Sequence, residues 1–309
     1  MNSIADNLFD LLFNENSFEL FEKSTNLPFR TVKNEKYKCI EYDLKINLLT
    51  FCKLYLPIKI TIIGFPVSIC EKGYQGDLDT IFNDYKTKDG IFLFLNDNKT
   101  YTFEPDRSGR TLSNCVFDNK FKTFSEYLNS LRSSYRRRIN IAIKKGNKLK
   151  IQKIKNTDFT DEIHNLYLNV LRNSKYPLET LNKNFFRLFE SEIYVWYADD
   201  KPIAFVQLKE LGGSLNFIFG GMDYKYRNQY DLYFNMLIFI LKKGIEKQCK
   251  VINFGQTAES AKMRIGCKME RRYMHIIAGN KVIDFILTKL IKYIEYREVK
   301  ENLKVFKDE

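Results

Sequence analysis

The segment from residue 215 to residue 268 most restricts the folds open to this chain. An apolar stretch over 215–222, typical of a strand, is followed by a polar turn without glycine over 223–229 and by a long apolar helix pattern over 230–248. A short strand pattern over 251–254 and a further helical stretch ending at Gly266 complete it. This order places the start of a helix at the ends of two strands, and such a place binds anions.

The composition favours a folded, basic, soluble protein. The chain has 309 residues, 44% hydrophobic and 15% aromatic, which is enough for one large or two ordinary domains. It shows no secretory signal pattern and no apolar run that would span a bilayer, so we expect a cytoplasmic protein. The formal charge of +12 indicates either an anionic partner or a solvated basic surface.

The cysteines and histidines argue against a metal centre. The six cysteines are scattered without CxxC spacing, which favours buried, reduced thiols over disulfides or zinc ligands. His164 and His275 are the only histidines. Acid–base chemistry must therefore rest on Asp, Glu, Tyr, Ser, Cys or the substrate itself.

Helix and strand patterns predict two regions that meet near residue 120. Residues 1–120 begin with helical patterns and continue with strands at 37–42, 59–63, 91–95 and 99–103, a helix over 78–85 and a polar turn over 106–110. Residues 121–309 begin with a basic amphipathic helix over 124–145 and end with an amphipathic helix over 282–296. We therefore expect an N-terminal α+β domain and a C-terminal domain that carries the site.

The order of predicted elements over 150–278 resembles the GCN5-related N-acetyltransferase (GNAT) superfamily. It reads strand, helix, helix, three strands, helix, strand, helix, strand. Residues 131–146, LRSSYRRRINIAIKKG, are similar to the S-x-x-x-R-x-x-I-x-x-A-x-K-x-G helix of the Fem-type peptidoglycan aminoacyltransferases. Phe254-Gly255 followed by Ser260, Lys262 and Gly266 looks like the F-G region of that branch at approximate spacing.

The resemblance covers roughly residues 121–280 and implies an α+β or α/β fold of tandem GNAT-like domains. Each domain would be a mixed, mostly antiparallel sheet flanked by helices, with the C-terminal domain better defined. Residues 1–120 would then form a degenerate first copy.

One segment departs from the superfamily pattern. The pyrophosphate loop, Arg/Gln-x-x-Gly-x-Gly/Ala, would start at Arg227, but Tyr230 and Leu232 occupy its glycine positions. Bulky residues hinder the close backbone approach to phosphate that glycine allows. Fem-type proteins, which use aminoacyl-tRNA, also tend to lose this loop. The donor therefore stays open between acyl-CoA, which is the first expectation for a co-substrate, an acyl carrier protein and aminoacyl-tRNA.

Acyl transfer to an amine needs a polarised carbonyl, a neutral nucleophile and a protonated leaving group. Backbone N–H groups at Gly220 and Gly221 are candidates for the oxyanion donors. Asp223 is the first candidate for the base, with Glu210 and Glu259 as weaker alternatives, and Tyr233 is a candidate acid. A carboxylate at a strand end, such as Asp223, is more often a turn or helix-cap residue than a base, and a tyrosine on an apolar helix stripe, such as Tyr233, is more often packed in the core than used as an acid.

Binding residues are expected on the turn and after the last buried strand. A donor phosphate would meet the turn residues Lys225, Arg227, Asn228 and Gln229, unless the turn is only a solvated basic surface. The candidates for substrate contact are Gln256, Lys262, Arg264 and Arg136.

The sequence thus predicts an N-acyltransferase without a metal. It would move an acyl or aminoacyl group to an amine of a small molecule, peptide or cell-wall precursor by direct attack in a ternary complex. Two alternatives stay open: a catalytically inactive GNAT-derived scaffold that binds an anionic ligand or partner, and an RNA-binding protein whose basic surface joins Arg136 to Arg227.

Overall fold

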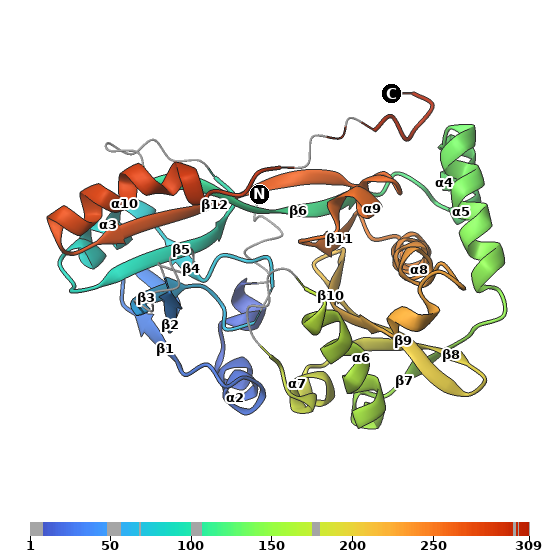
Figure 1. The fold of residues 1–309 in the computed structure, drawn as a ribbon, viewed down its shortest axis with the longest axis horizontal. Coiled ribbons are helices and arrows are strands. Elements are labelled where there is room, and N and C mark those ends of the chain that lie inside the picture. Colours follow the sequence, from blue (N-terminus) through green and yellow to red (C-terminus); the bar gives the residue numbers. More distant parts are fainter. Residues whose placement is uncertain are drawn as a thin grey trace. The chain divides into compact units, whose positions relative to one another are not determined.

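The computed structural model describes residues 9–47, 57–67, 69–99, 107–174, 180–298, 301 and 303–308. The chain divides into two compact units. Unit 1 comprises Met1–Ser113 and Arg271–Glu298, and unit 2 comprises Asn114–Glu270 and Val299–Glu309. The divisions fall inside two long strands, β6 (Ser108–Asp118) and β12 (Lys268–Ala278), so each unit is built from two separate parts of the chain (Figure 1).

Unit 1 is a sheet in the order β1-β2-β3-β5-β12, with β4 paired to β2. The pair β3 and β5 is parallel, and the pairs β1–β2, β2–β3, β2–β4 and β5–β12 are antiparallel. Its strands are β1 (Phe29–Lys33), β2 (Tyr37–Asn47), β3 (Pro57–Ile63), β4 (Tyr74–Gly76) and β5 (Ile91–Asp97), and its helices are α2 (Glu15–Ser24), α3 (Leu78–Lys86) and α10 (Lys281–Ile294).

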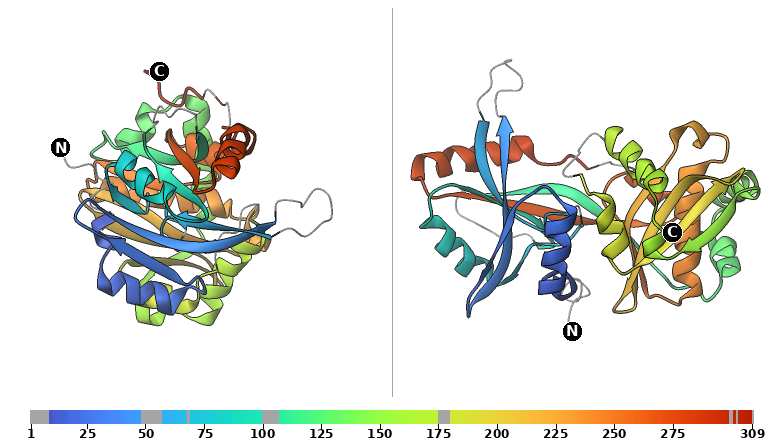
Figure 2. Two further views of the ribbon diagram at one scale, coloured as in Figure 1. Left: turned by 90° about the vertical axis from the view of Figure 1, so that its left-hand side faces the viewer. Right: turned by 90° about the horizontal axis from the view of Figure 1, so that it is seen from below.

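The alternation of side chains along β5 and β12 places helices on both faces of this sheet. Phe92 and Ile277 are register partners and pack in one core with α3. The neighbouring pair, Leu93 and Ile276, packs on the other face with Ile291 of α10. Figure 2 shows α3 and α10 on opposite sides of these strands. Unit 1 is therefore a three-layer arrangement.

Unit 2 is a sheet in the order β6-β11-β10-β9-β8-β7, in which β10 and β11 are parallel and the pairs β6–β11, β7–β8, β8–β9 and β9–β10 are antiparallel. Its strands are β7 (Lys150–Ile154), β8 (Glu192–Ala198), β9 (Lys201–Leu211), β10 (Ser214–Met222) and β11 (Val251–Gly255). Its α-helices are α4 (Phe124–Ser130), α5 (Ser133–Gly146), α6 (Asp161–Arg172), α7 (Lys183–Leu188), α8 (Leu232–Glu246) and α9 (Glu259–Met263), joined by 3-10 turns η2 (Asn156–Asp158) and η3 (Tyr224–Tyr226).

Helices cover both faces of this sheet as well. Ala204 and Val206 of β9 belong to the core that includes α8, whereas Phe205 between them contacts Phe159 and Phe186 on the other face. The packing of α8 depends on Gly244, because a Cβ there would lie 2.3 Å from Cδ1 of Ile252 in β11. A helix can approach the strand this closely only where it has no side chain.

The two units repeat one motif. In each, two parallel strands are joined through a helix, namely β3-α3-β5 in unit 1, where the short β4 precedes α3, and β10-α8-β11 in unit 2. In each unit an antiparallel strand, termed the closing strand, lies beside this second parallel strand. The closing strand of unit 2 is β6, which directly follows β5 along the described chain, and that of unit 1 is β12, which follows α9.

The structure departs from the expected elements at three places. The helix expected over 124–145 is two helices, because Leu131 forms a bridge with Phe306 and the N–H of Arg132 donates to the carbonyl of Val305 at 3.0 Å. The polar turn expected over 106–110 is wrong from Ser108 onward, where β6 begins. The C-terminal helix, assigned from the sequence to the second domain, groups with unit 1. The strand expected over 99–103 lies outside the described residues except for Lys99.

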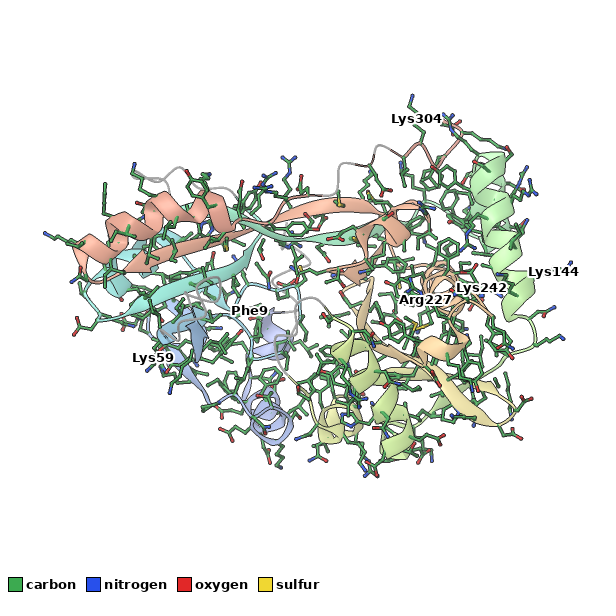
Figure 3. The ribbon with its side chains drawn as sticks, in the orientation of Figure 1. Phe9, Lys59, Lys144, Arg227, Lys242 and Lys304 are labelled. Atoms are coloured by element: carbon green, nitrogen blue, oxygen red, sulfur yellow. The ribbon has the colours of Figure 1, made fainter. Side chains whose placement is uncertain are left out.

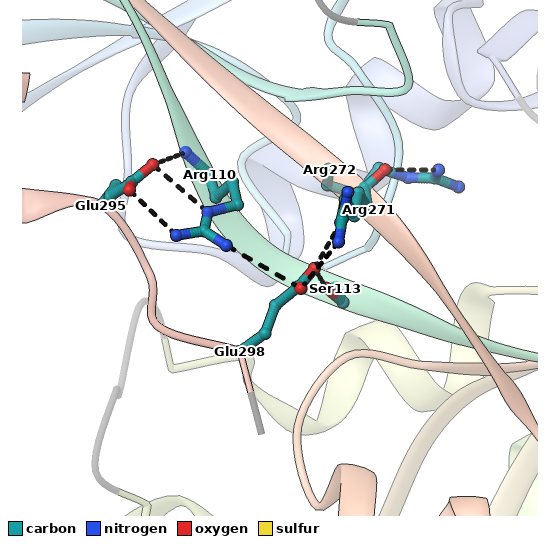
Figure 4. Close-up of polar contacts among 6 residues, drawn as sticks. All are labelled: Arg110, Ser113, Arg271, Arg272, Glu295 and Glu298. Carbon is teal, nitrogen blue, oxygen red and sulfur yellow. Dashed lines mark hydrogen bonds and ion pairs between the residues drawn. The ribbon is translucent and has the colours of Figure 1, made fainter. Parts of the chain in front are cut away.

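Ion pairs hold α10 and the residues after it against the strands of unit 1. Glu295 accepts hydrogen bonds from the backbone N–H and the guanidinium of Arg110, at 3.1 and 3.0 Å (Figure 4). Glu298 accepts from Arg271 at 3.0 Å, and Asp284 pairs with the buried Arg107 at 2.9 Å. The carboxylates of this segment are thus turned towards the sheet.

Candidate functional site

The parallel pairing of β10 with β11 ends before either strand does. It runs from Ser214 and Val251 to Asn216 and Asn253, whereas β10 continues to Met222. A bulge between Phe217 and Phe219 also disturbs the pairing of β10 with β9. Since successive residues of a strand direct their N–H groups to opposite sides, alternate N–H groups beyond Asn216 point to the side where the β11 ladder has ended. This end of the sheet offers backbone donors.

The two candidate oxyanion glycines lie in this segment and on opposite faces of β10. A Cβ on Gly220 would lie 2.9 Å from the ring of Phe217, and one on Gly221 would lie 2.4 Å from the backbone nitrogen of Tyr167 in α6. Packing against the backbone of α6 therefore requires glycine at position 221, whereas a Cβ at position 220 would displace the Phe217 ring. Their N–H groups stay candidates for oxyanion binding.

Asp223 caps the turn that follows β10. Its carboxylate accepts from the N–H of Lys225 at 2.9 Å, and its own N–H donates to the carbonyl of Ile203 at 2.8 Å. This is the capping role that the sequence left open beside catalysis. Asp223 is half-buried, and the four predicted phosphate contacts, Lys225, Arg227, Asn228 and Gln229, are exposed.

Several backbone N–H groups of the turn form hydrogen bonds with carbonyls of the same turn. Four of its N–H groups donate to carbonyls of residues 223–227 at 2.9–3.2 Å, and they belong to Tyr226, Arg227, Tyr230 and Leu232. Two of these are the positions that glycine holds in the superfamily's pyrophosphate loop. N–H groups bonded inside the turn are not free to hold a pyrophosphate.

The start of α8 carries a carboxylate of its own. Asp231 adopts a left-handed conformation with φ 49°, and its carboxylate accepts from both terminal nitrogens of Arg138 in α5, one of them at 2.9 Å. The Arg138 guanidinium also stacks on Phe234, with 4.3 Å between Cζ and the ring centroid. Asp231 thus lies at the helix terminus that would otherwise attract an anion. Sequence reasoning missed this pair, because the partners are 93 residues apart.

Further contacts join the basic helix α5 to the turn before α8. Lys145 donates to the carbonyl of Asn228 at 3.4 Å. Asn235 donates to the carbonyls of Ala142 and Tyr230, both at 2.7 Å, and Gly146 leaves room for it. These bonds join α5 to the turn, and Figure 3 marks one cation of each, Lys144 on α5 and Arg227 in the turn. The exposed cations of this basic surface are Arg137, Lys144, Lys145, Lys225 and Arg227.

Arg136 does not share this arrangement. It lies two residues before Arg138, and residues two apart on a helix point to nearly opposite sides. Since Arg138 faces the turn through Asp231, the side chain of Arg136 leaves α5 on the far side. The basic surface therefore runs from the turn to Lys144 and Lys145 without Arg136.

The loop between β11 and α9 is fixed by a buried lysine. Lys262 donates to the carbonyls of Gly255 and Gln256, at 3.1 and 2.7 Å, and is 2% exposed. These bonds hold a loop in which Thr257 and Ala258 have positive φ. Glu259 is buried beside this loop, whereas Arg264 is exposed.

Tyr233, which is partly buried, and the buried thiols of Cys115 and Cys267 have raised pKa values in this region. Burial raises the pKa of Tyr233, and the neighbouring Cys115, Cys267, Tyr224 and Glu259 raise it further. Burial also raises the pKa of Cys115 to about 11 and that of Cys267 well above its ordinary value. All three groups are therefore protonated at neutral pH. Tyr233 can donate a proton, and neither thiol is poised as a nucleophile.

Both histidines have partners in the core. Nε2 of His164 lies 2.9 Å from the carbonyl of Leu181. Nδ1 of His275 lies 2.8 Å from the hydroxyl of Ser108, and its Nε2 faces Asp97 at 3.5 Å. This serine, imidazole and carboxylate are all buried in unit 1, so they form an internal polar network.

No group of three or more His, Cys, Asp or Glu side chains among the described residues is arranged to hold a metal ion. Nor does any described helix have the length and hydropathy needed to cross a membrane.

No protein-family profile and no curated protein sequence match this chain. Solved structures do. The C-terminal domain of a putative lysylphosphatidylglycerol synthetase from Agrobacterium fabrum is 12% identical, with 96% of this chain and 99% of that one covered and a TM-score of 0.54. FemX is 10% identical, with 93% and 99% covered and a TM-score of 0.52. A conserved protein of unknown function from Bacteroides thetaiotaomicron is 10% identical, with 89% and 97% covered and a TM-score of 0.50.

These similarities define the fold as GNAT-like and Fem-like over nearly the whole chain. The expected α+β fold, with mixed and mostly antiparallel sheets flanked by helices, is confirmed.

Proposed function

We propose that this chain is an acyltransferase that moves an aminoacyl group from aminoacyl-tRNA to an amine. The observation that carries the proposal is the basic surface formed by α5 and the turn before α8, next to the end of β10. The fold shared with FemX and with the lysylphosphatidylglycerol synthetase domain supports a transferase. The acceptor would be an amine of a small molecule, a peptide or a cell-wall precursor.

The groups that the turn offers to a phosphate favour one donor over the others. Acyl-CoA is the donor that the GNAT resemblance implies. Its pyrophosphate would need backbone N–H groups that are already hydrogen-bonded within the turn. The cations available instead are side chains spread over a helix and a turn, an arrangement suited to the repeated phosphates of an RNA backbone. An acyl carrier protein would meet the same cations with carboxylates and stays a second donor to be tested.

The reaction would run by direct attack. A lysine-like amine has a pKa near 10.4, and its neutral form costs about 4–5 kcal/mol at pH 7. Glu259, buried beside the loop after β11, would accept that proton. The amine nitrogen would attack the ester carbonyl, and N–H groups of β10 near Gly220 would hold the oxyanion, at about 2.7–4 kcal/mol per donor. Tyr233 would protonate the departing ribose oxygen of the tRNA.

Thermal unfolding with candidate donors tests the proposal. Charged tRNA at about 100 times its dissociation constant should stabilise the protein by about 2.7 kcal/mol, and acetyl-CoA or free CoA should not. Transfer of a labelled amino acid to an amine should follow, and Glu259→Gln should abolish transfer while retaining the thermal shift.

Other outcomes would assign other functions. Stabilisation by a CoA ester alone would replace the donor. Stabilisation by tRNA without transfer to any amine would favour the RNA-binding alternative, and no shift with any donor would favour the inactive scaffold.

A further inference from the structure

Helix α10 in unit 1 carries the largest concentration of exposed apolar side chains on the described surface. Seven of the eleven large hydrophobic side chains that are exposed there lie on this 14-residue helix, at 41–83% exposure. The most exposed are Tyr293, Val282, Phe285 and Ile294. Single exposed apolar residues are ordinary, but a contiguous group marks an interaction surface.

Helix periodicity places Val282, Phe285, Ile286 and Tyr293 on the side of α10 away from the sheet, with Ile283, Leu290 and Ile294 along its flank. The inner face of α10 is formed by Leu287, Thr288 and Ile291. Leu287 and Ile291 pack with strand residues of unit 1, and Thr288 is buried. Phe285, Ile286 and Tyr293 fall on the other side of the helix by its periodicity. A helix that is apolar on both faces is normally covered on both. The composition of α10 predicts that its outer face is covered. No described residues cover it.

The charges of α10 indicate what covers it. Its carboxylate, Asp284, is turned inward and paired with Arg107, and Glu295, just past its end, is paired with Arg110. The lysines Lys281, Lys289 and Lys292 are exposed instead, and helix periodicity places them along one edge of the outer face. An apolar face with a cationic edge is complementary to an anionic lipid surface, whose acyl region accepts the apolar side chains and whose phosphates accept the lysines.

We propose that α10 docks unit 1 on the surface of an anionic phospholipid bilayer. The helix would lie in the plane of the interface, since 14 residues are too few to span a bilayer. A second copy of the chain fits the same face less well, because a symmetric contact would bring two lysine edges into one interface. This inference does not depend on the donor or acceptor of the proposed reaction.

Flotation with vesicles tests the docking. The full chain should bind phosphatidylcholine vesicles that contain about 30% phosphatidylglycerol, and bind pure phosphatidylcholine vesicles about tenfold or more weakly. Replacing the lysines with alanine should weaken binding about fivefold per lysine and about a hundredfold for all three. The double variant Phe285→Asp/Tyr293→Asp should not bind. The matched control Ile151→Asp/Leu188→Asp, which places aspartates at exposed apolar positions of unit 2, should bind like the parent.

A fluorescence reporter separates insertion from simple adhesion. Trp196 is the only tryptophan and is buried, so a Phe285→Trp variant adds one reporter on the outer face. Its emission should shift to the blue with anionic vesicles, and that of Leu188→Trp should not. Because these side chains point away from the core, circular dichroism and thermal unfolding should match the parent.

Three results would overturn the proposal. They are failure of the parent to bind anionic vesicles at low salt, undiminished binding by Phe285→Asp/Tyr293→Asp, and a dimer in sedimentation experiments that this variant abolishes. The last would assign the face to a second copy.

Discussion

Removing the exposed cations of the basic surface should weaken tRNA binding and make the tRNA affinity less dependent on salt concentration. The variant Lys144→Ala/Lys145→Ala/Lys225→Ala/Arg227→Ala removes four exposed positive charges from α5 and the turn. If each cation meets one phosphate, each contributes about 0.7–0.9 to the slope of log affinity against log salt, or about 3 for the four. Raising salt from about 50 to 200 mM would then cost the parent about sixtyfold more affinity than the variant.

Filter binding or fluorescence anisotropy with labelled tRNA, over a series of salt concentrations, measures this slope. The control variant Lys33→Ala/Lys36→Ala/Lys86→Ala/Lys99→Ala removes four exposed charges from unit 1 and lowers the net charge equally. It should change the slope by less than about one. If the basic-surface variant keeps the parent slope, or if both variants lose the same amount, the assignment of phosphate contacts to α5 and the turn is refuted.

Four further outcomes are expected. Gly221→Ala should destabilise the protein by about 1–3 kcal/mol in urea unfolding, because its Cβ would lie 2.4 Å from the Tyr167 nitrogen. Gly64→Ala, whose Cβ would have its nearest contact at 3.4 Å, should destabilise the protein less. Equal losses of stability in the two variants would contradict the packing argument. Tyr233→Phe should lower the transfer rate about 10²-fold or more with an unchanged melting temperature, and Tyr230→Phe should not. Cys115→Ala and Cys267→Ala should each retain transfer, because both thiols are protonated; loss of a burst-phase covalent intermediate in either would show the opposite. The hydrogen bond from Arg110 lowers the pKa of Glu295 from its ordinary 4.5. The pair therefore stabilises the folded protein above pH 4.5, and this stability is lost as the pH falls through the lowered pKa. Between about pH 7 and 3, the free energy of unfolding should depend less on pH in Glu295→Gln than in the parent.

Sequence periodicity predicted the elements of unit 2 because they are locally specified. The strand pattern over 215–222 became β10 at Ser214–Met222, and the helix pattern over 230–248 became α8 at Leu232–Glu246. Departures came from partners distant in sequence. Phe306 and Val305 break the basic helix at Leu131 and Arg132, and no local pattern records that contact.

The candidate site shows the same division. The capping role of Asp223 was foreseen because it depends on Lys225, two residues away. The bond between Asp231 and Arg138, which defines the start of α8, depends on how two helices pack. The bonds from Lys262 to the carbonyls of Gly255 and Gln256 arise from a loop with positive φ at non-glycine residues, which sequence patterns do not specify.

The exchange of closing strands has a consequence for how the chain is made. Unit 1 contains most of the first 113 residues, yet β12 and α10 are not synthesised until residues 268–294. While the ribosome makes unit 2, β5 therefore presents an unpaired edge and the inner face of α10 has no counterpart on the sheet. Unit 2 also waits for the end of the chain, because Val305 and Phe306 bond to Arg132 and Leu131. Neither unit can therefore complete its fold until almost the whole chain has left the ribosome, and the unpaired β5 edge is where a chaperone would bind in the meantime.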